Sequence, residues 1–335
     1  MNASSIRVLV TAVGGTLGQA VVKALRLARP QVEILGCDAD AVGVGAAFVD
    51  SFHAVPLASD VNAYRARISE ICAAQRVAAV IPASESEIEA LNADPPLEKV
   101  AVICQPREWF ATYADKLRCM QALAGKLQLA AFADGSDSRA VERIVAEVGF
   151  PLVVKGRRSS GSRHLRCARN EDELRQYLAE LPFPLVQQYI DDADGEFSIG
   201  LFACPRFTAA VALKRRLAEG CTWYAETSQD EHVLAYARSF AACSKLQGAA
   251  NLQVRKGKAS VRLLEVNPRF SSLAAARALC GFRDVEWSLA QALGQMPSVP
   301  PQAYGHIRFN RFFHELVDSG SGYGLVPQWD PRSRH

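Results

Sequence analysis

Residues 263–272 read Leu-Leu-Glu-Val-Asn-Pro-Arg-Phe-Ser-Ser, an apolar run that leads into a carboxylate, an amide, a proline and an arginine. In a β-strand, residues i and i+2 point to the same face, so Glu265 and Asn267 would present oxygen atoms side by side. Mg²⁺ prefers such ligands when it is shared with phosphate groups. Pro268 has no N–H and ends the strand, and the guanidinium of Arg269 can hold a phosphate or carboxylate. A strand end with a solvated glutamate and a surface arginine would explain the same residues.

The composition indicates an ordinary globular protein. A length of 335 residues favours two or three subdomains, and a net charge of +3 argues against a nucleic-acid partner. The nine cysteines include no Cys-x-x-Cys pair, which argues against a zinc motif and fits a reducing compartment. With no signal peptide and no long apolar span, we expect a cytoplasmic protein without a membrane partner. A homodimer is the common default for a soluble protein of this size.

The first 108 residues alternate between short apolar strands and helices. Strands are expected at residues 6–10, 33–37, 78–81 and 100–104, and helices at 19–28 and 61–75. This alternation predicts a parallel sheet covered on both faces, so residues 1–108 form a Rossmann-like α/β domain. Ser84–Glu87 follows a strand, where ligands often bind in open α/β sheets. The same residues would equally suit a helix N-cap with acids in its first turn.

A glycine loop after the first strand raises a competing hypothesis, an NAD-dependent oxidoreductase. Gly14, Gly15 and Gly18 lie where a dinucleotide fold binds pyrophosphate, and Asp38 lies where a ribose-binding acid is expected. The first glycine of that motif is missing, because position 12 is alanine. We therefore favour a substrate-contacting or purely structural role for this loop.

A strand at residues 150–155 ends in Lys155 and is followed by Gly-Arg-Arg-Ser-Ser-Gly-Ser-Arg at 156–163. Backbone N–H groups, hydroxyls and guanidiniums in such a loop can surround phosphate oxygens. The loop is not a P-loop, and a solvent-exposed hairpin tip is the alternative. Further along, strands at 251–254 and 260–265 form a hairpin that places Gln253 opposite Glu265 and Asn267.

These pieces together resemble the ATP-grasp superfamily, and most of all the synthetase halves of the carbamoyl-phosphate synthetase large subunit. The resemblance runs from Val8 to about Gly294. Its motifs appear in order at Asp115-Lys116, Pro151–Lys155, the loop containing Gly156, Ser159, Ser160, Gly161 and Ser162, the hinge Val186–Ile190, Gly195-Glu196, Asn251–Gln253 and Glu265–Arg269.

The resemblance implies an α/β and α+β fold, with a pre-ATP-grasp domain at residues 1–108, a lid at 109–185 and a C-terminal subdomain with the metal site at 186–335. ATP would lie between the last two parts. The lysines Lys116 and Lys155 and the loop would hold its phosphates. The hinge residues Gln187, Gln188, Tyr189 and Ile190 would read adenine, and Glu196 would bind the ribose. Gln253, Glu265 and Asn267 would hold Mg²⁺, with Mn²⁺ as a substitute.

The chain also departs from the synthetases. Their loop histidine is replaced by Cys221 or Thr222, and the chain is a single half-length unit, so a simple carbamoyl-phosphate synthetase is not expected. The resemblance instead implies a stand-alone ligase that joins small-molecule carboxylate and amine substrates through an acyl phosphate. Arg269, with Lys214 or Arg215, would offset charge on the transferred phosphoryl group. A non-catalytic ATP-binding module is the remaining alternative.

Overall fold

The computed structural model describes residues 6–29, 31–41, 43–158, 165–191, 194–258, 260–312, 316–318 and 323–325. The N-terminal part is a five-stranded parallel sheet of order β3-β2-β1-β4-β5. Its strands are β1 (Arg7–Val10), β2 (Glu33–Asp38), β3 (Ser51–Ala54), β4 (Ala79–Ile81) and β5 (Ala101–Val102). The helical segments between them are α1 (Thr16–Ala28), the 3-10 turn η1 (Val44–Phe48), α2 (Val61–Gln75) and α3 (Glu85–Leu91).

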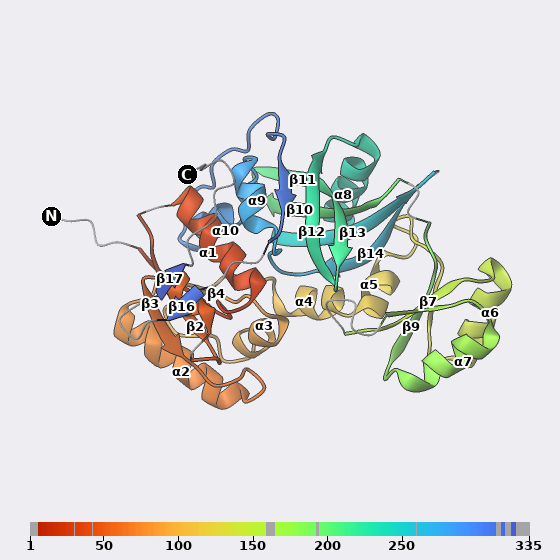
Figure 1. Ribbon diagram of the computed structural model, residues 1–335, viewed down its shortest axis with the longest axis horizontal. Coiled ribbons are helices and arrows are strands. Elements are labelled where there is room, and N and C mark those ends of the chain that lie inside the picture. The colour runs from red at the N-terminus through yellow and green to blue at the C-terminus, as the bar shows by residue number, and fades with distance from the viewer. Residues whose placement is uncertain are drawn as a thin grey trace, which may run out of the picture.

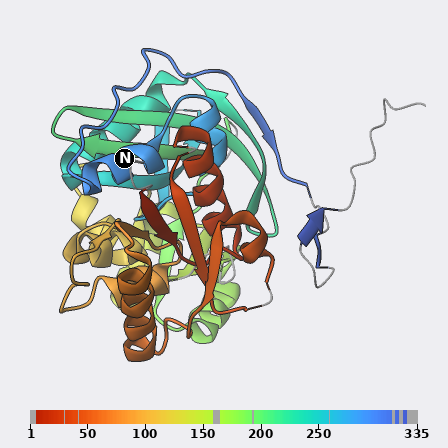
Figure 2. The same cartoon turned by 90° about the vertical axis from the view of Figure 1, so that its left-hand side faces the viewer.

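Both faces of this sheet are covered, as the continuous apolar strands predict. On one face, α1 packs against the sheet and against two C-terminal helices, α9 (Ala274–Leu279) and α10 (Asp284–Ala292). On the other face, α2 and α3 close a second core around Tyr64 and Ile68. Figures 1 and 2 show α1 between the sheet and the C-terminal body, with α2 on the far side. The N-terminal sheet is therefore joined to the C-terminal body through α1.

A four-stranded antiparallel sheet of order β6-β9-β7-β8 forms a separate lobe, seen at the right of Figure 1. Its elements are β6 (Phe132–Asp134), α6 (Ser138–Val148), β7 (Leu152–Gly156), β8 (Leu165–Ala168), α7 (Glu171–Glu180) and β9 (Pro184–Gln188). Leu152, Val154 and Val186 of the sheet pack against Ile144 of α6 and Leu174 of α7. The domain boundary that we expected at residue 185 falls inside β9. Every residue of β9 pairs with β6 or β7, so the whole strand belongs to this sheet.

The C-terminal body is built on a six-stranded sheet of order β14-β13-β10-β11-β12-β15. Its strands are β10 (Glu196–Cys204), β11 (Phe207–Ala218), β12 (Cys221–Ser228), β13 (Gly248–Gly257), β14 (Ser260–Asn267) and β15 (Arg308–Asn310). One face packs against α8 (Glu231–Ser244) and also against residues of α4 (Arg107–Ala114) and α5 (Lys116–Leu123). The other face packs against α9 and α10 around Trp287 and Phe282. Although α4 and α5 precede the lobe in sequence, they complete this C-terminal core.

Two short strands, β16 (Leu316–Asp318) and β17 (Tyr323–Leu325), pair with each other. The mixed α/β architecture and the parallel N-terminal sheet confirm the predicted fold class. Strand β12 was not expected, because the resemblance placed Cys221 and Thr222 in a loop; the structure has only a tight turn at Glu219 and Gly220, both with positive φ, before the strand begins at Cys221. Within the described residues, no helix has the length and apolar character required to span a membrane.

Candidate functional site

Strands β13 and β14 form the edge on which the site is built. Gln253 pairs with Glu265 across the hairpin, and Asn251 pairs with Asn267. The side chains of Glu265 and Asn267 lie next to each other, with Asn267 Nδ2 3.3 Å from Glu265 Oε1. The i, i+2 spacing in the strand thus places a carboxylate beside an amide.

Two lysines from different elements converge on Glu265. Lys116, the first residue of α5, has its Nζ 3.4 Å from Glu265 Oε2. Lys155, near the end of β7, donates from Nζ to Gln187 Oε1 and to the backbone carbonyl of Leu264, both at 2.8 Å. Both lysines are buried. Charged groups from the four-stranded lobe and from the C-terminal body therefore meet at one point.

Burial and neighbouring charges shift the titration of this cluster. Burial lowers the pKa of Lys155 to about 8, with Glu265 opposing the shift and the charge of Lys116 adding to it. Burial alone would raise the pKa of Glu265, but the charges of Lys116, Lys155 and Arg215 hold it below its ordinary value. Glu265 is therefore a carboxylate at neutral pH and carries the negative charge of the cluster.

Glu196 is held by two arginines of the neighbouring strands. Arg215 donates from Nε and Nη2 to Glu196 Oε1, at 3.0 and 2.6 Å, and Arg255 donates from Nε to Glu196 Oε2 at 3.0 Å. Arg215 Nη2 also donates to Gln253 Oε1 at 2.6 Å. Arg255 was not among the expected site residues. Its position two residues after Gln253 on one strand was the signal that could have identified it.

The hinge residues Gln187–Ile190 span the end of β9 and lie beside Arg255. The side chain of Gln187 is buried, and its Nε2 donates to the backbone carbonyl of Leu263 at 3.2 Å. The backbone carbonyl of Ile190 accepts a hydrogen bond from Arg255 Nη1 at 3.1 Å. The guanidinium of Arg255 also lies 5.8 Å from the centre of the Tyr189 ring. Arg255 therefore links the hinge to Glu196.

A cavity of about 270 Å³ lies between the lobe and the C-terminal body. Four cationic side chains and two carboxylates of the described residues line it, an excess of positive charge that suits a polyanion. The expected site residues that line this cavity are Lys116, Lys155, Gln187, Gln188, Tyr189, Ile190, Glu196, Arg215, Gln253 and Glu265. Val153, Leu165, Cys167 and Leu264, which were not expected, supply apolar surface.

The expected phosphate loop is only partly described. Gly156 ends β7, and the next residue, Arg157, donates to both carboxylate oxygens of Asp115 at 3.1 and 2.8 Å. Ser159, Ser160, Gly161 and Ser162 lie outside the described residues. The described part of the loop is thus anchored at the N-terminus of α5, next to Lys116.

Lys214 does not join the cluster. Consecutive residues of a strand point to opposite faces. Arg215 shares the face of Glu196 and Gln253, whereas Lys214 pairs with Phe197, whose side chain belongs to the core under α8. Lys214 is exposed and does not line the cavity. Of the two neighbouring cations considered for transition-state stabilisation, the structure places only Arg215 at the site.

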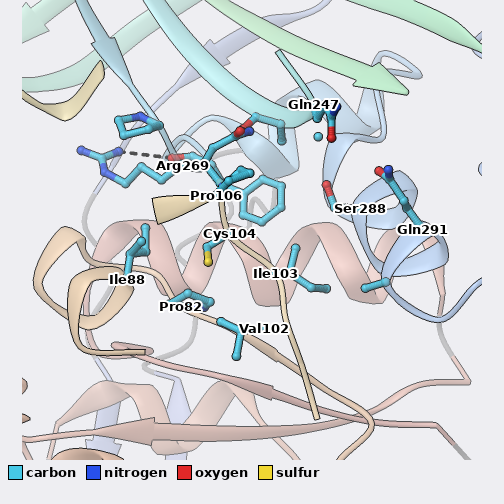
Figure 3. A pocket seen from close by; sticks show the side chains of 16 residues that line it. Pro82, Ile88, Val102, Ile103, Cys104, Pro106, Gln247, Arg269, Ser288 and Gln291 are labelled. Carbon is cyan, nitrogen blue, oxygen red and sulfur yellow. Dashed lines mark hydrogen bonds between the residues drawn. The ribbon is translucent and has the colours of Figure 1, made fainter. Parts of the chain in front are cut away.

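Arg269 lies beyond the end of β14, next to the N-terminal sheet. Its Nε is 3.4 Å from Glu85 Oε1 on α3, and its Nη1 donates to the backbone carbonyl of Phe270 at 3.2 Å. It lines two further cavities. One lies at the start of α1 and also includes Ser84 and Glu85. The other lies between β5, β13 and α10 and is drawn in Figure 3.

The glycine loop of the N-terminal sheet is stabilised internally. The N–H of Gly14 donates to Asp38 Oδ2 at 2.8 Å. A Cβ at Gly18 would lie 2.3 Å from the carbonyl oxygen of Ala12, so this glycine is required for close packing. Asp38, the residue considered for ribose binding, is therefore engaged in holding the loop, which favours the structural role of Gly14 and Gly18. Ser84 is the N-cap of α3 in a capping box with Glu87.

The residues at the β13–β14 edge fit a Mg²⁺ ion that is shared with phosphates. Such an ion needs only one or two protein carboxylates and keeps other oxygen ligands. Glu265 supplies the carboxylate and Asn267 an adjacent amide, whereas Gln253 Oε1 already accepts from Arg215. Among the described residues there is no group of three or more His, Cys, Asp or Glu side chains that could hold a metal ion. A metal ion here would therefore depend on its phosphate partner.

Comparisons with protein families agree with this geometry. A model described as ATP-grasp in the biosynthetic pathway with Ter operon matches residues 180–312. A RimK-like ATP-grasp domain matches residues 113–203. Both matched ranges include the hinge and Glu196. No curated protein sequence matches the chain.

Several solved structures share the fold. The biotin carboxylase domain of Hydrogenobacter thermophilus 2-oxoglutarate carboxylase, a dimer in complex with MgADP and bicarbonate, has a TM-score of 0.69 at 15% identity, covering 87% of this chain and 70% of that one. N5-carboxyaminoimidazole ribonucleotide synthetase of Thermus thermophilus has a TM-score of 0.71 at 17% identity, covering 90% and 82%. L-amino acid ligase of Bacillus licheniformis has a TM-score of 0.67 at 15% identity, covering 88% and 75%.

Proposed function

Because the chain belongs to the ATP-grasp superfamily of ATP-dependent ligases, we propose that it joins a small carboxylic acid to an amine through an acyl phosphate. The observation that carries this proposal is the cationic cavity that Glu265 lines, with Arg269 four residues further along the chain and lining a neighbouring cavity. A triphosphate needs positive charge along its length. An acid that attacks its γ-phosphate needs a cation at the point of attack.

The described residues divide the binding of ATP between them. Lys116 and Lys155 would hold the phosphates, since both are buried cations that line the cavity near Glu265. Adenine would lie between the apolar surface of Leu264 and the hinge at Tyr189. The ribose hydroxyls would meet Glu196, which is already oriented by Arg215 and Arg255.

Glu265 and Asn267 would hold Mg²⁺, for which Mn²⁺ is expected to substitute. The bound ion would supply positive charge to the phosphate oxygens. Gln253 would take part by exchanging its hydrogen bond from Arg215 for a contact with the ion. Lys116, which pairs with Glu265, would then turn toward the phosphates.

The reaction would have two steps. A carboxylate oxygen of the acid attacks the γ-phosphorus, and the bond to the β,γ-bridging oxygen breaks, so that ADP leaves and an acyl phosphate forms. The amine nitrogen then attacks the carbonyl carbon, and phosphate leaves as the nitrogen loses a proton. Arg215 and Arg269 would offset the negative charge during the first step, and the lobe would exclude water from the acyl phosphate.

A screen for ADP release tests the proposal. The protein is incubated with ATP and Mg²⁺ or Mn²⁺ and with pooled carboxylic acids and amines, and products are identified by mass spectrometry. We expect ADP release to rise with one acid pool and an amide to form with one amine pool. Binding of ATP without ADP release above background in any pool would instead indicate a non-catalytic ATP-binding module.

Two neighbouring residues of β11 provide a matched pair of variants. Arg215→Met should reduce ADP release about a hundredfold, because an electrostatic contact to the transferred group is lost. Lys214→Met should remain near wild type, because Lys214 lies on the opposite face of the sheet. Equal effects of the two substitutions would contradict the assignment of Arg215.

A further inference from the structure

A cavity of about 220 Å³ lies between the N-terminal sheet and the C-terminal body, apart from the nucleotide cavity. Its walls come from the ends of β4 and β5, from the start of β13, and from α10. Figure 3 shows Pro82, Ile88 and Val102 along one side of this space and Ser288 and Gln291 at the opposite end from Arg269. Segments distant in sequence thus enclose one space whose wall continues to Arg269.

The wall is largely uncharged. Ile88 and Phe270 are buried, Val102 and Ile103 are half-buried, and all four present apolar surface. Among the described residues that line this cavity, Arg269 is the one that carries a charge. The cavity therefore favours a ligand with an apolar body and one negative group.

One neutral polar group in the wall has an unused hydrogen-bonding capacity. Gln105 is 3% exposed, and its Nε2 donates to the backbone carbonyl of Ala249 at 2.7 Å. Its Oε1 is buried and has no hydrogen-bond partner in the described part of the chain. Buried amide oxygens normally have a donor, so this oxygen is an unsatisfied polar atom in a wall that is otherwise largely apolar.

Arg269 connects this cavity to the place of reaction. It follows Glu265 by four residues, lies just past the end of β14, and also lines the cavity that contains Glu85. We propose that the cavity in Figure 3 holds the uncharged body of the carboxylic acid substrate, with its carboxylate at Arg269. This inference rests on the proposed function and adds the class of acid that the enzyme selects.

Size and charge narrow the class further. At about 220 Å³ the cavity is smaller than the nucleotide cavity of about 270 Å³, so it suits a small acid. A protonated amine would face the charge of Arg269 without a carboxylate in the described wall. A second carboxylate on the acid would be buried without a cation to pair with. The substrate is therefore a small monocarboxylic acid with an apolar body that is uncharged.

Direct binding tests the selection without requiring turnover. Hexanoate, adipate and hexylamine have similar lengths and differ in their charged groups. Saturation-transfer NMR on the full chain should detect hexanoate, with adipate and hexylamine at least roughly tenfold weaker. Phenylpropionate extends the series with an aromatic body. If none of the monocarboxylates binds, or if adipate or hexylamine binds as well as hexanoate, the inference is overturned.

Variants at the end of α10 test the location. Ala292 lines the cavity, so Ala292→Leu and Ala292→Trp should weaken hexanoate binding progressively, to about tenfold for tryptophan. Ala242→Trp introduces the same ring at an exposed position of α8, outside the cavity, and should bind hexanoate like wild type. Circular dichroism checks that each variant is folded. If Ala292→Trp does not fold, hexanoate binding by Ala292→Leu decides the test. Undiminished hexanoate binding in a folded Ala292 variant refutes the location.

The two proposals can fail separately. If hexanoate binds with the expected selectivity but no acid raises ADP release, the cavity assignment stands and the ligase reaction is wrong. If ADP release is found only with acids that carry a second charge, the ligase reaction stands and the class of acid is wrong.

Discussion

Removal of the amine of Lys155 provides the most specific test of the nucleotide site. Lys155 Nζ donates to Gln187 Oε1 and to the carbonyl of Leu264, and burial lowers its pKa to about 8 although the charge of Glu265 opposes the shift. In Lys155→Met this cation is lost. A charge-assisted hydrogen bond contributes about 1.5–3 kcal/mol, so ATP should bind about 10- to 150-fold more weakly at pH 7.

The pH dependence of ATP binding gives the same prediction a second readout. Phosphate favours the protonated lysine, so ATP binding raises the pKa of Lys155 above about 8. Above that pH the free protein must take up a proton to bind ATP, and the affinity should fall by up to about tenfold per pH unit. The nearby Cys119 thiol has a pKa raised by burial to about 12 and does not titrate in this range.

Isothermal titration calorimetry between pH 7 and pH 9.5 measures both effects. Wild type should lose affinity above pH 8, whereas Lys155→Met should be weak and much less sensitive to pH. Lys126→Met, at an exposed lysine after α5, should follow wild type. If Lys155→Met retained wild-type affinity, or lost affinity above pH 8 with the wild-type slope, the placement of the phosphates at Lys155 would be wrong.

Three further substitutions address other parts of the molecule. Glu265→Gln should reduce ADP release about a hundredfold at saturating Mg²⁺, because the carboxylate proposed to hold Mg²⁺ is lost; unchanged turnover would rule out that role. Arg255→Met should raise the KM for ATP more than it lowers kcat in steady-state assays, because Arg255 links the hinge to Glu196, the residue proposed to bind the ribose; the reverse pattern would contradict this. Arg277→Met should lower the free energy of unfolding in urea by about 3–5 kcal/mol, since buried Asp284 would lose its cation; a loss below about 1 kcal/mol would refute the importance of this pair.

The fold could be predicted where the spacing of apolar residues and the residues that end each element indicate the same structure. Continuous apolar strands alternating with helices predict the parallel N-terminal sheet, and β1, β2 and β4 form within a few residues of the expected ranges. Strand β12 is different. Its sequence at Cys221–Ser228 mixes polar and aromatic residues, and it is a strand because both neighbours, β11 and β15, supply backbone partners. Long-range pairing of this kind leaves a weak local signal.

Side-chain placement at the site could be predicted in part. The spacing of Glu265 and Asn267 fixes their shared face, and hairpin register brings Gln253 opposite Glu265. The same parity rule separates Arg215 from Lys214, but the strand's alignment with Glu196 and Phe197 has to be known before the rule can be applied. The same rule places Arg255 on the face of Glu196 once the pairing of β10 with β13 is known. The motif sequence alone does not show that Glu196 has two arginine partners.

Helix α3 of the N-terminal part contacts both the C-terminal body and the four-stranded lobe, which no sequence motif indicates. Glu85 and Glu89 are four residues apart and so lie on one face of the helix. Glu85 is 3.4 Å from Arg269 at the end of β14, and Glu89 is 2.8 Å from Arg158 in the segment after β7. Both members of the Glu89–Arg158 pair are substantially exposed, at 47% and 53%, so this pair contributes little to stability.

An anion that enters between the lobes can therefore compete for Arg158 at small cost, and it can also compete with Glu85 for Arg269, in a pair that is more buried. A phosphate that attracts Arg158 would release Glu89, and a carboxylate that binds Arg269 would release Glu85. The N-terminal sheet, which contributes no residue to the nucleotide cavity among those described, would then respond to both substrates through α3. Arg269 belongs to the Glu265–Arg269 motif, whereas Pro82 after β4 and Ile88 of α3, which also line the proposed acid cavity, do not, so the motif alone does not reveal them.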